Sequence, residues 1–219
     1  MSKIDPMLMK LAKAFATNKD ELNSLILSYS LDELRFLVLH QLEVNLTDPN
    51  FSSLAEAVPL EMCGYEQVPG KHGYDGYLGS SPEDAQEVVE AKPEKSYLKE
   101  DGSVSGKLNG GGSYADYTIE RLERDKSLGD KLVLLISGWV NGDLIYVYKV
   151  PHNHPNFVHK IEERTNQLIS QGKRVLPSFS YTNYMDCQDI RLVFLKDNLS
   201  DYSQYMSRPF YNWLLTLKG

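Results

Sequence analysis

The chain has 219 residues, which is enough for one domain with a sizeable hydrophobic core. Its formal net charge of −7 argues against a protein that coats nucleic acid by charge alone. The chain has no apolar run of about 18 residues, so we expect no transmembrane helix. The N-terminal segment has no apolar stretch before a small-residue cleavage site, so we expect a cytoplasmic protein. Cys63 and Cys187 are the only cysteines, and we expect free thiols rather than a disulfide or a zinc site.

The first part of the chain is predicted to be helical. Asp5-Pro6 has the pattern of an N-cap followed by proline in the first turn. Ser30 and Glu33 have the spacing of a capping box, which opens a further helix. Helical spacing of apolar residues predicts helices from Pro6, over 19–29 and from Ser30 to about Asn45, and a short helical turn over 52–58.

From about residue 65, short runs punctuated by glycine replace the helical pattern, which is typical of strands and turns. The strongest signal is Asn141-Gly142 between two apolar runs, which predicts a β-hairpin. Strict alternation in the second run places Leu144, Tyr146 and Tyr148 on one face of a strand. We expect strands over 74–78, 86–91, 131–139, 144–150 and 191–195, and a glycine-rich loop over 93–112 with room for a short hairpin around 103–107. The segment 117–126 is either a short helix or a strand edge, and helices are expected over 158–171 and 202–217.

This order of elements predicts an α/β (α+β) fold with a central mixed β-sheet flanked by helices. We expect a single domain over 1–219. Residues 1–58 would form its N-terminal helical part, 65–200 the sheet core with the functional site, and 201–219 a C-terminal segment.

Asp75 precedes a turn and the run that ends in Glu90-Ala91-Lys92. Period-2 alternation places Glu90 and Lys92 on one face of a strand, with Ala91 pointing the other way. Two carboxylates can hold Mg²⁺, which prefers oxygen ligands and keeps several waters, and the Ala91 carbonyl is available as a third ligand. Lys92 would orient or help to deprotonate an attacking water. The pattern is suited to cutting a phosphodiester.

Asp75 with the Glu90-Ala91-Lys92 triplet resembles the active-site motif of the PD-(D/E)xK nuclease superfamily, although Tyr74 stands where that motif has proline. The glycine-rich loop after the triplet and the hairpin at Asn141-Gly142 look like the downstream part of some restriction-type endonucleases. The resemblance implies a restriction-endonuclease-like fold and a prokaryotic or phage origin. It also implies Mg²⁺-dependent, site-specific cleavage of double-stranded DNA by a homodimer.

The resemblance also implies an upstream acid, supplied to the metal by an N-terminal helix. We favour Glu43, at the end of the third predicted helix. Glu33, Glu61 and Glu66 are the alternatives. Each of these glutamates can equally be a solvated helix residue.

Several polar and basic residues are DNA-contact candidates if the nuclease interpretation holds. Glycine lets backbone amides approach a phosphate closely, and local basic groups contact phosphates directly. The histidines His152, His154 and His159 are expected to lie on the surface rather than to bind a metal. The predicted DNA contacts are Lys107, Asn109, Ser113, Tyr114, Arg121, Arg124, Lys173 and Arg174.

Three other interpretations of the sequence stay open. The protein could be a repair, recombination or phage nuclease of the same fold that has no recognition site. It could be a non-catalytic acidic protein that binds another protein, as a DNA mimic does. Glu90 and Lys92 could also be an exposed strand face with cross-strand charges, and Asp75-Gly76 an ordinary turn.

Overall fold

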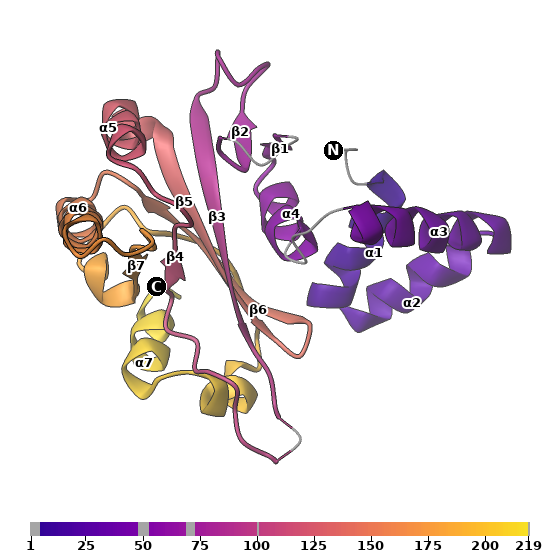
Figure 1. Ribbon diagram of the computed structural model, residues 1–219. Helices are drawn as coiled ribbons and strands as arrows, with labels where there is room; N and C mark the ends of the chain where they lie inside the picture. The colour runs from indigo at the N-terminus through magenta and orange to yellow at the C-terminus, as the bar shows by residue number, and fades with distance from the viewer. Residues whose placement is uncertain (1–4, 48–52, 69–72, 100, 219) are drawn as a thin grey trace.

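A computed structural model describes residues 5–47, 53–68, 73–99 and 101–218, and the side chains of 41–47 are outside this description (Figure 1). The helices predicted near the N-terminus are confirmed in the described residues. Asp5 Oδ1 accepts a hydrogen bond of 2.8 Å from the Met7 N–H, and Ser30 and Glu33 make the reciprocal bonds of a capping box. The helices here are α1 (Pro6–Thr17), α2 (Lys19–Ser28), α3 (Leu31–Thr47) and α4 (Ser53–Met62), the last being longer than the predicted turn.

Within the described residues, six strands form a mixed sheet in the order β1-β2-β3-β5-β6-β8. The pair β3 and β5 is parallel and the other neighbours are antiparallel. A parallel pair needs a crossover connection, which α5 (Ile119–Leu128) provides. The strands are β1 (Glu66–Gln67), β2 (Gly76–Leu78), β3 (Glu87–Ser96), β5 (Leu132–Val140), β6 (Asp143–Pro151) and β8 (Arg191–Leu195).

Helices cover both faces of this sheet (Figure 1). On one face lie α1 to α4, and on the other α5, α6 (Pro155–Ser170) and α7 (Arg208–Thr216), with the short ribbon of β4 (Gly112–Ser113) and β7 (Ser178–Phe179). The strand β5 contributes Leu135 to the core beside α4 and Leu134 and Ile136 to the core beside α6. Burial on both faces explains why its sequence is a continuous apolar run.

The predicted hairpin at Asn141-Gly142 is present between β5 and β6. Both residues have positive φ, 50° and 84°, as a type I′ turn requires. The predicted alternation after it is wrong at Leu144, because the register shifts beside Gly138 and Trp139. Leu144 therefore packs in the core of the α4 face, whereas Tyr146 packs in the core of the opposite face.

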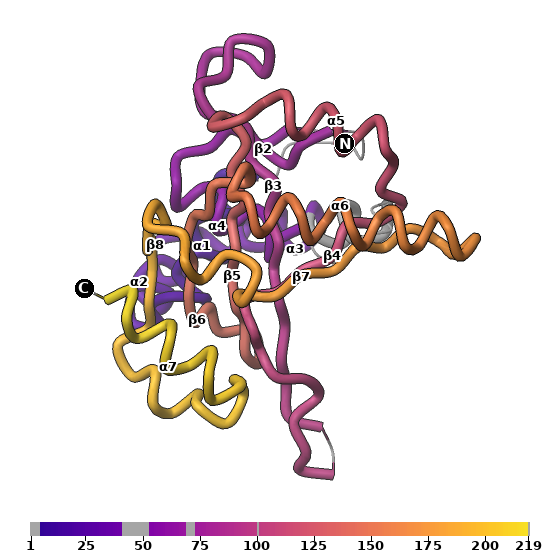
Figure 2. The backbone as a smooth tube through the Cα atoms, turned by 90° about the vertical axis from the view of Figure 1, so that its left-hand side faces the viewer, coloured from indigo at the N-terminus to yellow at the C-terminus, as the bar shows by residue number. Residues whose placement is uncertain are grey.

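The strand β3 is longer than predicted and continues through Pro93 to Ser96, where a loop was expected. The Ala91 N–H points to the edge beyond β2, since it donates to Asp75. Pro93 faces the same edge by alternation, so its missing N–H removes no bond to β5. The chain then folds back in a hairpin with a bridge between Leu98 and Val104, which extends beyond the sheet (Figure 2).

The C-terminal segment closes the core beside α6. The predicted helix over 202–217 is divided into 3-10 turns at Leu199–Tyr205 and α7, because Ser207 caps a new helix there. Tyr181, Tyr184 and Tyr205 are buried in this core. Among the described helices, none is long and apolar enough to cross a membrane.

Candidate functional site

The site begins where β2 and β3 part. Asp75 immediately precedes β2, and its N–H donates to the Val89 carbonyl at 2.9 Å. Beyond this point β3 has no backbone partner on its β2 side among the described residues, and the Asp75 side chain takes that place: Oδ2 accepts a hydrogen bond of 2.7 Å from the Ala91 N–H. In an extended strand the N–H and C=O of one residue point to the same side, so the Ala91 carbonyl shares this edge with Asp75.

Glu90 and Lys92 lie on one face of β3, as the alternation predicts. Lys92 Nζ is 2.7 Å from Glu90 Oε1, and Arg121 Nη2 of α5 is 2.7 Å from Oε2. Glu90 is only 7% exposed. A buried carboxylate needs such compensation. The pair is therefore not the solvated strand face that one interpretation of the sequence allowed.

The Asp75 carboxyl has an unusual electrostatic environment. Its pKa is raised to about 7, chiefly by burial and then by the charges of Glu90 and Glu56, while Lys92 and the Ala91 N–H oppose the shift. Asp75 and Glu90 are thus close enough to repel each other in a partly dry site. A carboxyl whose pKa is raised toward neutral pH is typical of functional sites.

Glu56, on α4, is an acid that the sequence analysis did not select. Its charge acts on Asp75, whereas Glu33 caps the N-terminus of α3 and Glu61 pairs with Lys13 at 3.2 Å. The side chain of Glu43 lies outside the described residues. A signal for Glu56 existed, since it is the single charged residue in the apolar run from Ser53 to Leu60.

Asp125 of α5 is the centre of a second, buried group. It is 1% exposed and accepts hydrogen bonds of 2.6 Å from the hydroxyls of Tyr74 and Tyr117. Arg121 Nε lies 3.7 Å from Asp125 Oδ2. Because Tyr74 is the neighbour of Asp75, this group connects α5 to the segment that carries Asp75.

Tyr114 and Gly112 enclose Lys92. The ammonium of Lys92 lies 4.3 Å from the centre of the Tyr114 ring, and a Cβ on Gly112 would be 3.2 Å from the Lys92 side chain. Tyr114 is 1% exposed. Its ring therefore has no free face for a DNA base, which differs from the predicted DNA contact.

The structure places the other predicted DNA contacts in two groups. Arg121 lies inside the site, on Glu90, and Asn109 is half-buried with its N–H donated to Glu94 at 2.8 Å. Arg174 is exposed and makes two hydrogen bonds to Asp116, at 2.7 and 2.8 Å. The side chains that are exposed are Lys107, Ser113, Arg124, Lys173 and Arg174.

His152 is buried, which corrects the expectation of a surface histidine. It is 1% exposed, and burial lowers its pKa to about 4. Neither ring nitrogen has a hydrogen-bond partner in the described structure, and Nε2 lies 4.0 Å from Asp125 Oδ2. His152 therefore packs as a neutral ring behind the site.

The oxygen donors of the site can be matched to the ligands that Mg²⁺ prefers. Among the described side chains, no group of three or more His, Cys, Asp or Glu is arranged as a metal site. Asp75, Glu90 and the Ala91 carbonyl are nevertheless oxygen donors of the type that Mg²⁺ prefers. The repulsion that raises the Asp75 pKa is the kind that a dication relieves, so these residues fit the ion in chemistry.

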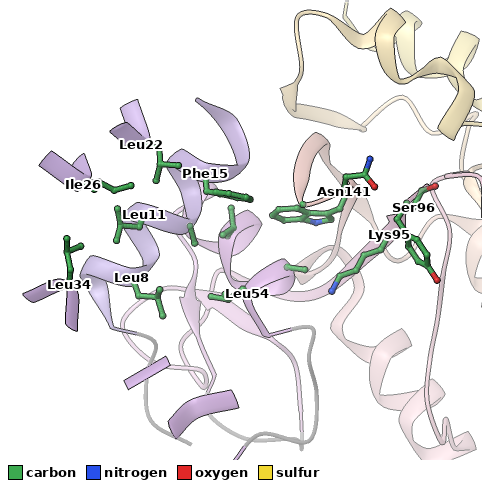
Figure 3. A pocket seen from close by; sticks show the side chains of 16 residues that line it. Leu8, Leu11, Phe15, Leu22, Ile26, Leu34, Leu54, Lys95, Ser96 and Asn141 are labelled. Atoms are coloured by element: carbon green, nitrogen blue, oxygen red, sulfur yellow. The ribbon is translucent and has the colours of Figure 1, made fainter. Parts of the chain in front are cut away.

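An apolar cavity of about 690 Å³ lies on the other face of the sheet, between the N-terminal helices and the β5–β6 turn (Figure 3). Leu8, Leu11 and Phe15 line it from α1, and Trp139 lines it from β5. Among its described lining residues Lys95 alone is charged. Its apolar lining does not suit a phosphate backbone.

No protein-family model matches this chain, and no curated protein matches it either. What can be inferred about its function therefore depends on the geometry around Asp75, Glu90 and Lys92.

Proposed function

We propose that this protein is a Mg²⁺-dependent endodeoxyribonuclease that hydrolyses phosphodiester bonds of double-stranded DNA. The observation that carries the proposal is the convergence of Asp75, Glu90 and Lys92 where β2 and β3 part. The order of elements is also in keeping with the resemblance to restriction-type endonucleases, since a helix follows β3 and a hairpin then extends the sheet.

The proposed roles follow from the contacts. Asp75, Glu90 and the Ala91 carbonyl would hold Mg²⁺, with Glu56 as a further acid on α4 in place of Glu43. When bound, the ion would supply an activated water and neutralise developing charge on the phosphate. Lys92 Nζ would orient the attacking water, and Tyr114 holds this ammonium in place through its ring.

A cleavage assay on supercoiled plasmid tests the proposal. We expect nicking and linearisation with MgCl₂ and none with EDTA. The double substitution Glu90→Ala, Lys92→Ala should reduce the rate by ~100-fold or more, because general acid–base groups and metal ligands each contribute on that scale. Lys95→Ala is the matched control, since Lys95 lies on the same strand but lines the cavity of the opposite face.

Each outcome has a consequence. Absence of metal-dependent cleavage in the parent protein would refute the enzyme and favour a non-catalytic acidic protein. Cleavage that survives the double substitution would refute this site. Discrete fragments would support a site-specific, restriction-type enzyme, whereas a smear would support a nuclease without a recognition site.

Cleavage of both strands at one site also implies a homodimer, because two active sites are needed. Light scattering with and without duplex DNA tests this part. A monomer that still produces discrete double-strand breaks would overturn it.

A further inference from the structure

Arg121 lies between two carboxylates. Its Nη2 donates to Glu90 Oε2 at 2.7 Å, and its Nε is 3.7 Å from Asp125 Oδ2. On the Glu90 side, Arg121 shares the anion with Lys92, whose Nζ is 2.7 Å from the other oxygen. Glu90 therefore keeps a cation when Arg121 leaves it.

On the Asp125 side, Arg121 is much harder to replace. Asp125 is 1% exposed, and its other close guanidinium belongs to Arg124, at 4.0 Å on a half-exposed side chain. A buried carboxylate that loses its cation is strongly destabilising. The hydroxyls of Tyr74 and Tyr117 also fix Asp125, at 2.6 Å each. Asp125 is thus the fixed end of the arrangement and Glu90 the exchangeable end.

Arg121 also has unused donors. A guanidinium carries five N–H groups in a planar fork that matches the oxygens of a phosphate. Among the described residues, the hydrogen bond to Glu90 is the one that this side chain makes, and Nε is buried without a partner. The side chain can therefore exchange one anion for another without leaving Asp125.

We propose that Arg121 is a phosphate-binding residue whose guanidinium is bound to Glu90 as long as no divalent cation occupies the site. Glu90 releases it when its carboxylate turns to a divalent cation, and the freed edge of the guanidinium then binds a non-bridging oxygen of the DNA phosphate. Asp125, with Tyr74 and Tyr117, is the positioning group that keeps the other edge in place. The inference rests on the proposed function, and it adds the order in which cation and DNA engage the site.

The proposal has a signature that a merely structural arginine does not have. Removing Arg121 removes a competitor for Glu90, so a divalent cation should bind ~3- to 10-fold more tightly without DNA. The same change removes a charged hydrogen bond to phosphate, so duplex DNA should bind ~10- to 100-fold more weakly. Damage to the fold would weaken both affinities.

Arg121→Gln leaves Asp125 without its closest cation, so this variant can fail to fold. Arg121→Lys keeps a positive charge beside Asp125 but lacks the planar fork and its reach toward Glu90. It should change both affinities in the same directions by smaller factors. Arg35→Gln is the control for charge, because Arg35 is an exposed residue of α3 on the other side of the sheet (Figure 1).

The cation affinity is measured with Mn²⁺ by electron paramagnetic resonance in the absence of DNA. The DNA affinity is measured by fluorescence anisotropy of a labelled duplex in Ca²⁺. Tighter Mn²⁺ binding with weaker DNA binding in the Arg121 variants, and neither change in Arg35→Gln, would support the proposal. Unchanged or weaker Mn²⁺ binding in Arg121→Lys would overturn the exchange at Glu90, and unchanged DNA binding would overturn the phosphate contact.

These outcomes are distinct from failure of the proposed function. If the parent protein neither binds nor cuts duplex DNA, the nuclease proposal and the phosphate contact fall together. The Mn²⁺ comparison still decides whether Arg121 competes with a cation for Glu90.

Discussion

The carboxylate of Glu94 accepts a hydrogen bond of 3.0 Å from the backbone N–H of Gly110, and this bond joins β3 to the glycine-rich loop that follows it. The same oxygen also accepts the N–H groups of Asn109 and Gly111, at 2.8 and 3.4 Å. Successive N–H groups that converge on an anion form a backbone nest. The backbone N–H groups of this loop, which were candidates for binding phosphate, are thus bound by a carboxylate of the chain itself.

The nest predicts a large stability effect for Glu94. Glu94→Ala would leave the N–H groups of Asn109, Gly110 and Gly111 without their acceptor, and we expect it to lower the free energy of unfolding by ~2–4 kcal/mol. Glu94→Gln is the control, because the amide oxygen still accepts these bonds. Urea unfolding measures both variants. Equal stabilities for Ala and Gln would show that the nest does not depend on this acceptor.

The glycine loop is packed rather than flexible, and this gives a second prediction. Gly110 has a φ of +65°, and a Cβ there would lie 2.4 Å from the Tyr148 hydroxyl and 2.7 Å from Phe210. Gly110→Ala should therefore destabilise the fold by about 2–3 kcal/mol, from overpacking and backbone strain together. Gly106→Ala in the same segment meets nothing within 4 Å. Thermal unfolding should show little or no loss for this control, and equal losses for the two variants would contradict the packing.

Replacing Asp75, a proposed metal ligand, is predicted to stabilise the fold above neutral pH. Its pKa is about 7 when folded and near 3.8 ordinarily, chiefly because the carboxyl is buried. Between these pH values the folded state holds a proton on Asp75 that the unfolded state has lost, so the contribution of Asp75 lowers stability as pH rises from about 4 to 7. Asp75→Asn cannot ionise and keeps an acceptor for the Ala91 N–H. At pH 8 with a chelator it should be more stable than the parent by on the order of 2 kcal/mol.

The control for Asp75→Asn is pH itself. At pH 4 the parent carboxyl is protonated in the folded state and about two-fifths protonated in the unfolded state, so the difference between the two proteins should fall to well under ~1 kcal/mol. Urea unfolding at the two pH values measures this. An Asn variant that is less stable than the parent at pH 8 would show that Asp75 is not strained by burial and by Glu90.

Local patterns in the sequence predicted those elements whose cause is local. The capping box at Ser30, the turn at Asn141-Gly142 and the alternation of Glu90 and Lys92 each depend on residues a few positions apart, and each is present in the structure. The continuation of β3 through Pro93 could not be predicted in this way. It depends on the pairing with β5 and on an open edge beyond β2, which only the assembled sheet reveals.

The same distinction holds within the candidate site. Asp75 and Glu90 were found because they flank one turn of the chain. Asp125 and His152 were missed as members of the site, because their roles come from burial by elements far apart in sequence. The hydrogen bond from Tyr74 to Asp125 spans fifty-one positions. Glu56 was missed for the same reason, since only the packing of α4 against β3 brings its charge near Asp75.

The buried ring of His152 is expected to affect the stability of the fold at acidic pH. Its ring lies edge-on to Phe157, with the centroids 5.1 Å apart, and burial lowers its pKa to about 4 although the charge of Asp125 opposes this shift. Between pH about 6.5 and 4 the unfolded state binds a proton at this residue that the folded state does not, so the contribution of His152 lowers stability as pH falls through this range, opposite in sign to that of Asp75. His152→Phe keeps an aromatic ring against Phe157 and removes the titration. When the pH is lowered from 7 to 4.5, the free energy of unfolding of His152→Phe should fall less than that of the parent, by on the order of 2 kcal/mol.

His159→Asn, at an exposed position of α6, is the control, and its free energy of unfolding should change with pH as that of the parent does. Urea unfolding at both pH values measures the three proteins, and an equal acid loss in His152→Phe and the parent would show that another group governs the acid response.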